Sequence, residues 1–134
     1  MNTRQITLDK KAKLLIIDDQ LGTRKVLEHF FNKEFEVTIK SDGMQGMNWL
    51  ELGNNPDIII TDLNMPYLNG KEFTKAIRAS SLHRNVHIII LSGIDESEEK
   101  IECLDLGADD YMVKPFNPME IRAKIMAILR RLKP

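Results

Sequence analysis

The sequence predicts one α/β domain in which a parallel β-sheet lies between two layers of helices. Two observations lead to this prediction. Short apolar segments of strand length alternate with segments of helical periodicity, in the order βαβαβαβαβα. Several apolar segments are continuous and rich in β-branched residues, which is typical of strands buried on both faces of a parallel sheet. The 134 residues suffice for one domain, and right-handed crossovers are expected between its strands.

Five segments have the pattern of strands, at residues 13–17, 35–40, 57–61, 86–91 and 111–113. The first, third and fourth are the continuous apolar runs, so we expect them in the interior of the sheet. The second alternates between apolar and polar residues and presents one apolar face, which favours an edge position. The fifth is short and has the weakest pattern.

Between the strands, apolar residues recur three or four positions apart, as in amphipathic helices. The last helix has the clearest stripe, formed by Ile121, Ile125, Ile128, Leu129 and Leu132. Four weaker stripes precede it along the chain: Val26, Leu27, Phe30 and Phe31; Met44, Met47 and Leu50; Phe73, Ala76 and Ile77; and Ile101 with Leu104. Capping-box pairs predict three helix starts, at Asn69 with Glu72, Asp95 with Glu98, and Asn117 with Glu120.

Composition excludes several classes of protein. Nineteen Lys and Arg against twenty Asp and Glu give a net charge of -1, so the domain lacks the basic excess of a nucleic-acid or anionic-membrane binder. The single cysteine, Cys103, excludes an internal disulfide framework and a multi-cysteine zinc site. No apolar run approaches the length of a membrane span, and the N-terminus has no apolar signal region. We therefore expect a cytoplasmic protein with a loose segment at 1–11, a domain at 12–132, and the chain end or the start of a linker at 133–134.

Polar side chains follow the predicted strands at the points where these end. Asp18 and Asp19 follow the first strand, Asp62 the third, Ser92 the fourth and Lys114 the fifth. Each alone has an ordinary explanation as a helix cap, a turn residue or a solvated charge. The carboxyl ends of parallel strands share one edge of the sheet, however, and carboxylates gathered there repel one another unless a cation binds.

Carboxylate oxygens with room for water and phosphate oxygens suit Mg²⁺. A carboxylate beside a divalent cation can attack phosphorus, while the cation and a lysine neutralise the charge on the transferred group. Asp62 is the best candidate nucleophile, because it ends the central strand and precedes an open loop. Asp18 and Asp19 are then the metal-holding carboxylates.

Four segments, LLIIDDQ, IIITDLNMPYLNG, IIILSG and LGADDYMVKPF, occur in an order and spacing that resemble the receiver domain of two-component response regulators. The resemblance covers about residues 12–132. It implies the flavodoxin-like (βα)5 fold with strand order 2-1-3-4-5. It also implies a signalling domain that catalyses its own phosphorylation and autodephosphorylation, with a histidine kinase or phosphotransfer protein as its phosphodonor.

The resemblance assigns a role to each residue at this edge. By similarity, Asp62 is the phosphoacceptor and Lys114 contacts the phosphoryl group. The resemblance also implies that Asp19 binds Mg²⁺ directly, that Asp18 acts largely through water, and that Asn64 supplies a backbone carbonyl to the metal. Ser92 corresponds to the switch hydroxyl and Tyr111 to the switch aromatic. A cis peptide between Lys114 and Pro115 is implied as well. Ile94 stands at a position that varies in the family and affects the lifetime of the phosphorylated state.

The last third of the chain is more specifically similar to receivers of winged-helix transcription factors. These dimerise through the face made by the fourth helix, fifth strand and fifth helix. The implied ion pairs across the two-fold axis are Lys100 with Glu120, Asp110 with Lys124, and Asp109 with Arg131. The competing interpretation is that these are solvated charges on a monomer. A DNA-binding role requires an output domain after residue 134, which the length of the chain does not decide.

Two alternative functions remain open at this point. A small Mg²⁺-dependent phosphatase with an aspartate nucleophile resembles haloacid-dehalogenase enzymes, but those have an acidic residue where this chain has Asn64. A phosphorylation-independent pseudo-receiver is a pure interaction module, and such proteins usually lose an acidic or lysine position that this chain keeps. A flavodoxin-like electron carrier is disfavoured because Asp18 and Asp19 stand where a flavin phosphate needs hydroxyls and amides.

Overall fold

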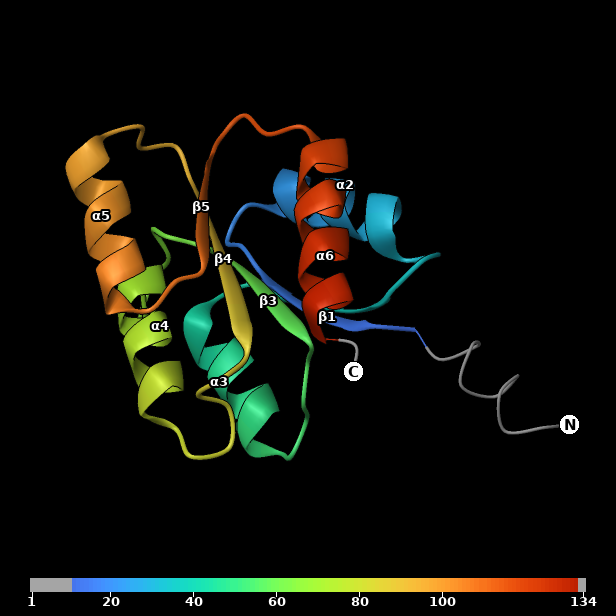
Figure 1. Ribbon diagram of the computed structural model, residues 1–134, viewed down its shortest axis with the longest axis horizontal. Coiled ribbons are helices and arrows are strands. Elements are labelled where there is room, and N and C mark those ends of the chain that lie inside the picture. The colour runs from blue at the N-terminus through green and yellow to red at the C-terminus, as the bar shows by residue number, and fades with distance from the viewer. Residues whose placement is uncertain (1–10, 133–134) are drawn as a thin grey trace, which may run out of the picture.

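The computed structural model describes residues 11–132, which form one five-stranded sheet with helices on both faces (Figure 1). All neighbouring strands are parallel, and their order is β2-β1-β3-β4-β5, which confirms the predicted fold class. The expectations for residues 1–10 and 133–134 lie outside the described part of the chain. None of the described helices is both long and apolar enough to cross a membrane.

The strands and helices alternate along the described chain. The strands are β1 (Lys13–Ile17), β2 (Glu36–Lys40), β3 (Ile58–Asp62), β4 (His87–Ser92) and β5 (Asp110–Val113). The helices are α2 (Leu21–Phe31), α3 (Gly43–Glu51), α4 (Gly70–Ala79), α5 (Ser97–Leu106) and α6 (Pro118–Leu132). Each predicted strand is therefore present, with bounds that differ by one residue or less.

The burial of the strands follows their sequence pattern. The apolar strands β1, β3 and β4 lie in the interior of the sheet and are almost completely buried, whereas the alternating β2 forms an edge. In the register of the sheet, Ile17 lies beside Thr61, Asp62 beside Leu91, and Ser92 beside Val113. The polar residues that end these strands consequently meet at one edge, which we call the carboxyl rim.

Two apolar clusters cover the two faces of the sheet. Helices α2 and α6 pack on one face through residues such as Phe31 and Ile125. Helices α3, α4 and α5 pack on the other face through residues such as Leu50, Phe73 and Cys103. The apolar stripe predicted for α6 is confirmed at Ile121, Ile125 and Ile128, which are buried, whereas Leu132 is exposed.

The stripe predicted for α5 is wrong. Ile101 is 57% exposed and Leu104 is 44% exposed, while Cys103 is the buried residue of the helix. The reason is that α5 lies near the edge of the sheet and meets the core along a narrow line, so residues on both sides of Cys103 face outward. In α2, Val26 and Phe30 are also exposed, so the buried stripe of this helix is narrower than predicted.

The predicted helix starts have mixed outcomes. The capping box at α4 is confirmed: the Glu72 N–H donates to Asn69 Oδ1 over 2.8 Å, and the Asn69 N–H donates to Glu72 Oε1 over 3.0 Å. The box predicted from Asp95 is wrong, because α5 begins one residue after Glu96 and the Asp95 carboxylate instead pairs with Lys100 at 2.6 Å.

Two further helix starts differ in detail from expectation. At α6, Asn117 Oδ1 accepts from the Met119 N–H at 2.9 Å, and the Glu120 N–H bonds to the Asn117 carbonyl instead. At α3, Asp42 accepts from the Gln45 N–H at 2.9 Å, a cap that the sequence pattern did not predict.

Candidate functional site at the carboxyl rim

Three carboxylates meet at the carboxyl rim. Asp18, Asp19 and Asp62 each offer an oxygen atom, and these atoms lie within 4.8 Å of one another. Asp18 is buried and Asp62 is only 7% exposed, whereas Asp19 faces solvent. Because β1 and β3 are neighbours in the sheet, the residues that end them are brought together from distant parts of the chain.

Lys114 reaches this cluster from the end of β5. Its Nζ lies 2.9 Å from Asp18 Oδ2 and 3.4 Å from Asp62 Oδ1. The Lys114 N–H donates to the Ser92 carbonyl over 2.7 Å, which ties the lysine to the end of β4. The peptide between Lys114 and Pro115 is cis, as expected. One ammonium group therefore faces three carboxylates, and negative charge remains in excess.

Burial and the neighbouring negative charge both raise the pKa of Asp62. Burial raises the pKa of Asp62 to about 6, and the neighbouring Asp18 charge adds to this effect while Lys114 opposes it. The Leu63 N–H donates to Asp62 Oδ1 over 2.8 Å and stabilises the charged form. A bound divalent cation relieves such repulsion, and hard carboxylate oxygens are the ligands that Mg²⁺ prefers, so the residues present fit this metal.

The two adjacent aspartates differ in how freely their oxygens can bind a ligand. Asp18 Oδ1 accepts from the Gln20 N–H over 2.8 Å, and its Oδ2 accepts from Lys114, so both oxygens already have partners. The Asp18 carbonyl also accepts from Arg24 over 2.8 Å. Asp19, in contrast, is exposed at the rim.

The loop after β3 carries Asn64 and is tightly closed at its far end. The Gly70 N–H donates to the Leu63 carbonyl over 2.7 Å. A Cβ at Gly70 would lie 2.6 Å from the Asp62 carbonyl oxygen, so this close approach requires glycine. Gly70 therefore supports the site, and sequence reasoning did not single it out.

Ser92 and Tyr111 are joined through one backbone segment. Ser92 is buried, and its Oγ accepts from the Ile94 N–H over 3.1 Å. The Tyr111 hydroxyl donates to the Ile94 carbonyl over 2.7 Å, so the ring already points toward the β4–α5 loop. Burial raises the pKa of Tyr111 above its usual value.

The predicted dimer face is occupied by ion pairs within the chain. Lys124 pairs with Asp110 at 2.6 Å, so a pair predicted between two copies is made inside one copy. Lys100 pairs with Asp95 at 2.6 Å, and Asp109 pairs with Arg78 at 2.9 Å. Glu120 and Arg131 lie exposed on α6.

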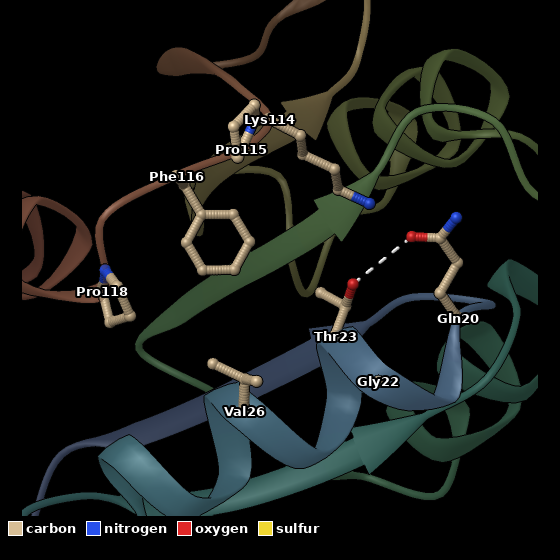
Figure 2. A pocket seen from close by; sticks show the side chains of 8 residues that line it. All are labelled: Gln20, Gly22, Thr23, Val26, Lys114, Pro115, Phe116 and Pro118. Atoms are coloured by element: carbon tan, nitrogen blue, oxygen red, sulfur yellow. Dashed lines mark hydrogen bonds between the residues drawn. The ribbon is translucent and has the colours of Figure 1, made fainter.

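A groove of about 910 Å³ runs beside the carboxylates (Figure 2). Its walls come from α2 and from the β5–α6 loop and are formed by Gln20, Gly22, Thr23, Val26, Lys114, Pro115, Phe116 and Pro118. Figure 2 shows the Lys114 side chain extending from the loop toward the side where Gln20 and Thr23 lie. Sequence reasoning missed this groove, because it forms between two segments that are distant in the chain.

Comparison with known proteins places this site in a family. The family model described as the response regulator receiver domain matches residues 14–126. The chain is 41% identical over 127 residues to a probable transcriptional regulator, ycf27, of Guillardia theta, which covers 94% of this chain and 48% of the relative. It is 38% identical over 120 residues to the alkaline phosphatase synthesis transcriptional regulatory protein PhoP of Bacillus subtilis, covering 89% of this chain and 49% of the relative. The chain thus spans about half the length of these curated relatives.

Solved structures agree with the family match. The receiver domain of the Francisella response regulator 1452 superposes with a TM-score of 0.83 at 34% identity, covering 91% of this chain and 99% of that chain. The chemotaxis response regulator CheY4 of Vibrio cholerae superposes with a TM-score of 0.82 at 32% identity, covering 89% of this chain and 99% of that chain. With the acidic cluster at the carboxyl rim, these matches show that the chain belongs to the response regulator receiver domain family. It is a two-component signalling module, and its curated relatives include transcriptional regulators.

Proposed function

We propose that this domain accepts a phosphoryl group from a phosphohistidine onto Asp62. The observation that carries the proposal is the cluster of three carboxylates within 4.8 Å, two of which Lys114 contacts. In the transfer, an Asp62 carboxylate oxygen forms a bond to phosphorus while the bond from phosphorus to the histidine nitrogen breaks. That nitrogen keeps the electron pair and takes up a proton from solvent, and Asp62 becomes an acyl phosphate.

The residues around Asp62 are proposed to bind the metal and to neutralise the transferred phosphoryl group. Asp19, Asp62 and the Asn64 carbonyl are the proposed ligands of Mg²⁺, and Asp18 acts through water because its oxygens already have partners. When bound, the metal supplies charge neutralisation for the phosphoryl oxygens. Lys114 adds a second positive charge, and its bond to Asp18 holds the ammonium group in place.

The switch follows from the contacts of Ser92. To reach a phosphoryl oxygen on Asp62, the Ser92 hydroxyl gives up its bond to the Ile94 N–H, and the β4–α5 loop changes shape with it. Tyr111, whose hydroxyl bonds the Ile94 carbonyl of the same segment in this structure, then turns inward into the space that Ser92 vacates. The face made by α5, β5 and α6 then differs between the two states, which is a two-state equilibrium biased by a local charge.

The proposed phosphodonor is a histidine kinase or a phosphotransfer protein, and it docks over the groove of Figure 2. Asp62 is 7% exposed, so a donor histidine reaches it only from above the carboxyl rim. The groove borders that path and offers apolar side chains such as Val26 and Phe116 beside Lys114. An apolar surface next to the reacting group suits a protein partner better than a small phosphate ester.

The α5–β5–α6 face is the proposed site of homodimerisation. Because Lys124 already pairs with Asp110 inside the chain, a dimer exchanges one ion pair for another and gains little from that exchange. We therefore expect a weak, salt-sensitive dimer of the activated form. Transcriptional control is proposed only for a longer protein in which a DNA-binding domain follows this one, as the lengths of the relatives suggest.

The phosphoacceptor assignment is tested by intact-mass analysis after incubation with acetyl phosphate and Mg²⁺. Wild type gains the mass of one phosphoryl group, and Asp62→Asn does not. A wild-type protein that takes up no phosphoryl group is a pseudo-receiver. Steady hydrolysis of a generic phosphate ester indicates a phosphatase instead.

A further inference from the structure

Tyr67 has an unusual backbone conformation for its residue type. Its φ is 70°, and it is the one non-glycine residue with positive φ in the described range 11–132. The Leu68 N–H donates to the Pro66 carbonyl over 2.8 Å, which closes a γ-turn with Tyr67 at its centre. A γ-turn with positive φ is rare and strained, and a bulky side chain increases the strain.

The backbone that follows Tyr67 is held in place. On the C-terminal side, Asn69 is part of the capping box of α4, and Gly70 is bonded to Leu63. Leu68 lies against the start of α3 so closely that a Cβ at Gly43 would come within 2.5 Å of the Leu68 carbonyl oxygen. The turn is therefore fixed by its neighbours, and a glycine at position 67 adopts it without strain.

The Tyr67 ring contributes nothing visible to the fold. Tyr67 is 84% exposed. Two leucines are similarly exposed, Leu52 after α3 and Leu82 after α4. These leucines precede β3 and β4 and so lie at the opposite, amino-terminal edge of the sheet, whereas the Tyr67 loop starts from Asp62 at the carboxyl rim.

The loop places Tyr67 on the other side of Asp62 from the groove. The groove belongs to α2 and α6, which cover one face of the sheet, while the Tyr67 loop leads into α4 on the opposite face. A protein that presents a histidine to Asp62 must cover the rim between these two features. It therefore rests on the groove with one part of its surface and meets the loop with another.

We propose that Tyr67 is an anchor residue for the protein that donates the phosphoryl group. The inference rests on the proposed function and adds a specificity-determining residue to it. A tyrosine ring offers a rigid, large apolar surface with a polar tip, and such side chains dominate the binding energy of many interfaces. The γ-turn fixes the backbone that carries the ring before the partner arrives, so little loop freedom is lost on binding.

The test compares a protein donor with a small one. The protein donor is the phosphorylated cytoplasmic domain of a histidine kinase, chosen from a panel as the one that transfers fastest to the wild-type chain. The small donor is phosphoramidate with Mg²⁺. The variants are Tyr67→Gly, which removes both ring and strain, Tyr67→Phe, which keeps the ring, and Leu82→Ala, the matched control of similar exposure (80%) at the far edge of the sheet.

Tyr67→Gly is expected to raise Tm by a few degrees, because it relieves the strained turn. Its phosphorylation by phosphoramidate stays within about twofold of wild type, while kcat/KM for transfer from the kinase falls about tenfold or more, mainly through KM. Tyr67→Phe retains most of the transfer rate, and Leu82→Ala behaves as wild type with both donors.

Several results overturn the proposal. Unchanged transfer from the kinase to Tyr67→Gly shows that the ring binds no donor. An equal loss with phosphoramidate places the ring in the phosphosite itself rather than in an interface. If no kinase in the panel transfers faster than phosphoramidate, the proposed donor class is wrong. If the wild type accepts nothing from either donor, the proposed function fails as well.

Discussion

Helices α5 and α6 flank β5 and are attached to the sheet in different ways (Figure 1). Helix α6 buries Ile121, Ile125 and Ile128, each of which stabilises the fold by roughly 1.5–3 kcal/mol. Helix α5 buries only Cys103. It is also attached by ion pairs: Lys71 of α4 pairs with Glu99 at 2.7 Å and with Glu102 at 3.0 Å, and such partly exposed pairs contribute about 0–1 kcal/mol each.

The difference in attachment indicates which of the two helices responds in the proposed phosphorylation switch. The β4–α5 loop connects Ser92 to α5, so a movement of Ser92 pulls on the weakly attached helix. Helix α6 is held by its isoleucines and provides the fixed side of the same face. The proposed partner surface is thus made of one movable and one fixed element, and the proposed switch acts mainly on the movable one.

The largest expected effect comes from truncating the buried stripe of α6. Ile125→Ala is expected to lower the free energy of unfolding by about 2–5 kcal/mol, since it removes a fully buried side chain and leaves a cavity. Cys103→Ala, the corresponding change in α5, is expected to cost about 1 kcal/mol because fewer atoms are lost. Urea denaturation measures both, and equal losses would contradict the claim that α6 is the better anchored helix.

The cost of the Asp62 charge at the carboxyl rim is measured by Asp62→Asn. The folded-state pKa of Asp62 is about 6, above its ordinary value of 3.8, so the folded protein binds the proton more tightly than the unfolded chain. Wild-type stability therefore falls as pH rises through this window, and above it the buried charge destabilises the fold.

Without metal, Asp62→Asn is expected to be more stable than wild type by roughly 1–2 kcal/mol near pH 7.5, after a discount for solvent screening, and equal to it near pH 4. Thermal unfolding in EDTA across this range checks the expectation, with the exposed Asp105→Asn as the matched control. Millimolar Mg²⁺ should raise the Tm of wild type by mass action. If the difference in stability between Asp62→Asn and wild type does not change with pH, the Asp62 charge is not its cause.

The link between the rim and α5 is tested by Tyr111→Phe. This change removes the hydroxyl that donates to the Ile94 carbonyl at 2.7 Å, a bond worth about 0.5–1.5 kcal/mol. We expect hydrogen exchange to accelerate in the β4–α5 loop and in α5, by up to about tenfold, while the amides of α6 keep their wild-type rates. Equal acceleration in both helices would mean that they open as one unit.

The smallest effect concerns the ion pairs of α5. Lys71→Ala is expected to lower stability by about 0–1 kcal/mol at low salt and by less at high salt, because exposed pairs are screened. Lys75→Ala, an exposed lysine of the same helix, is the control. A loss above that of Cys103→Ala would make the electrostatic contacts the main attachment of α5.

Much of the rim could be predicted from the sequence, because parallel strands end at one edge and buried strands have a recognisable composition. Asp62 and Lys114 therefore come together as expected, although they belong to distant segments. The different exposures of Asp18 and Asp19 could not be predicted, since they depend on which of two adjacent side chains turns inward. The groove and the γ-turn at Tyr67 depend on packing between loops, which the hydrophobic periodicity of the sequence does not predict.

The ion pair of Lys114 with Asp18 has a consequence for the synthesis of the protein. These residues are separated by 96 positions in the sequence, and the lysine belongs to the segment after the last strand. A ribosome-bound chain that lacks this segment has the acidic residues but not the lysine that we propose contacts the phosphoryl group. An unfinished chain that ends before Lys114 should consequently be a poor phosphoryl acceptor, even though its acidic residues have already been made.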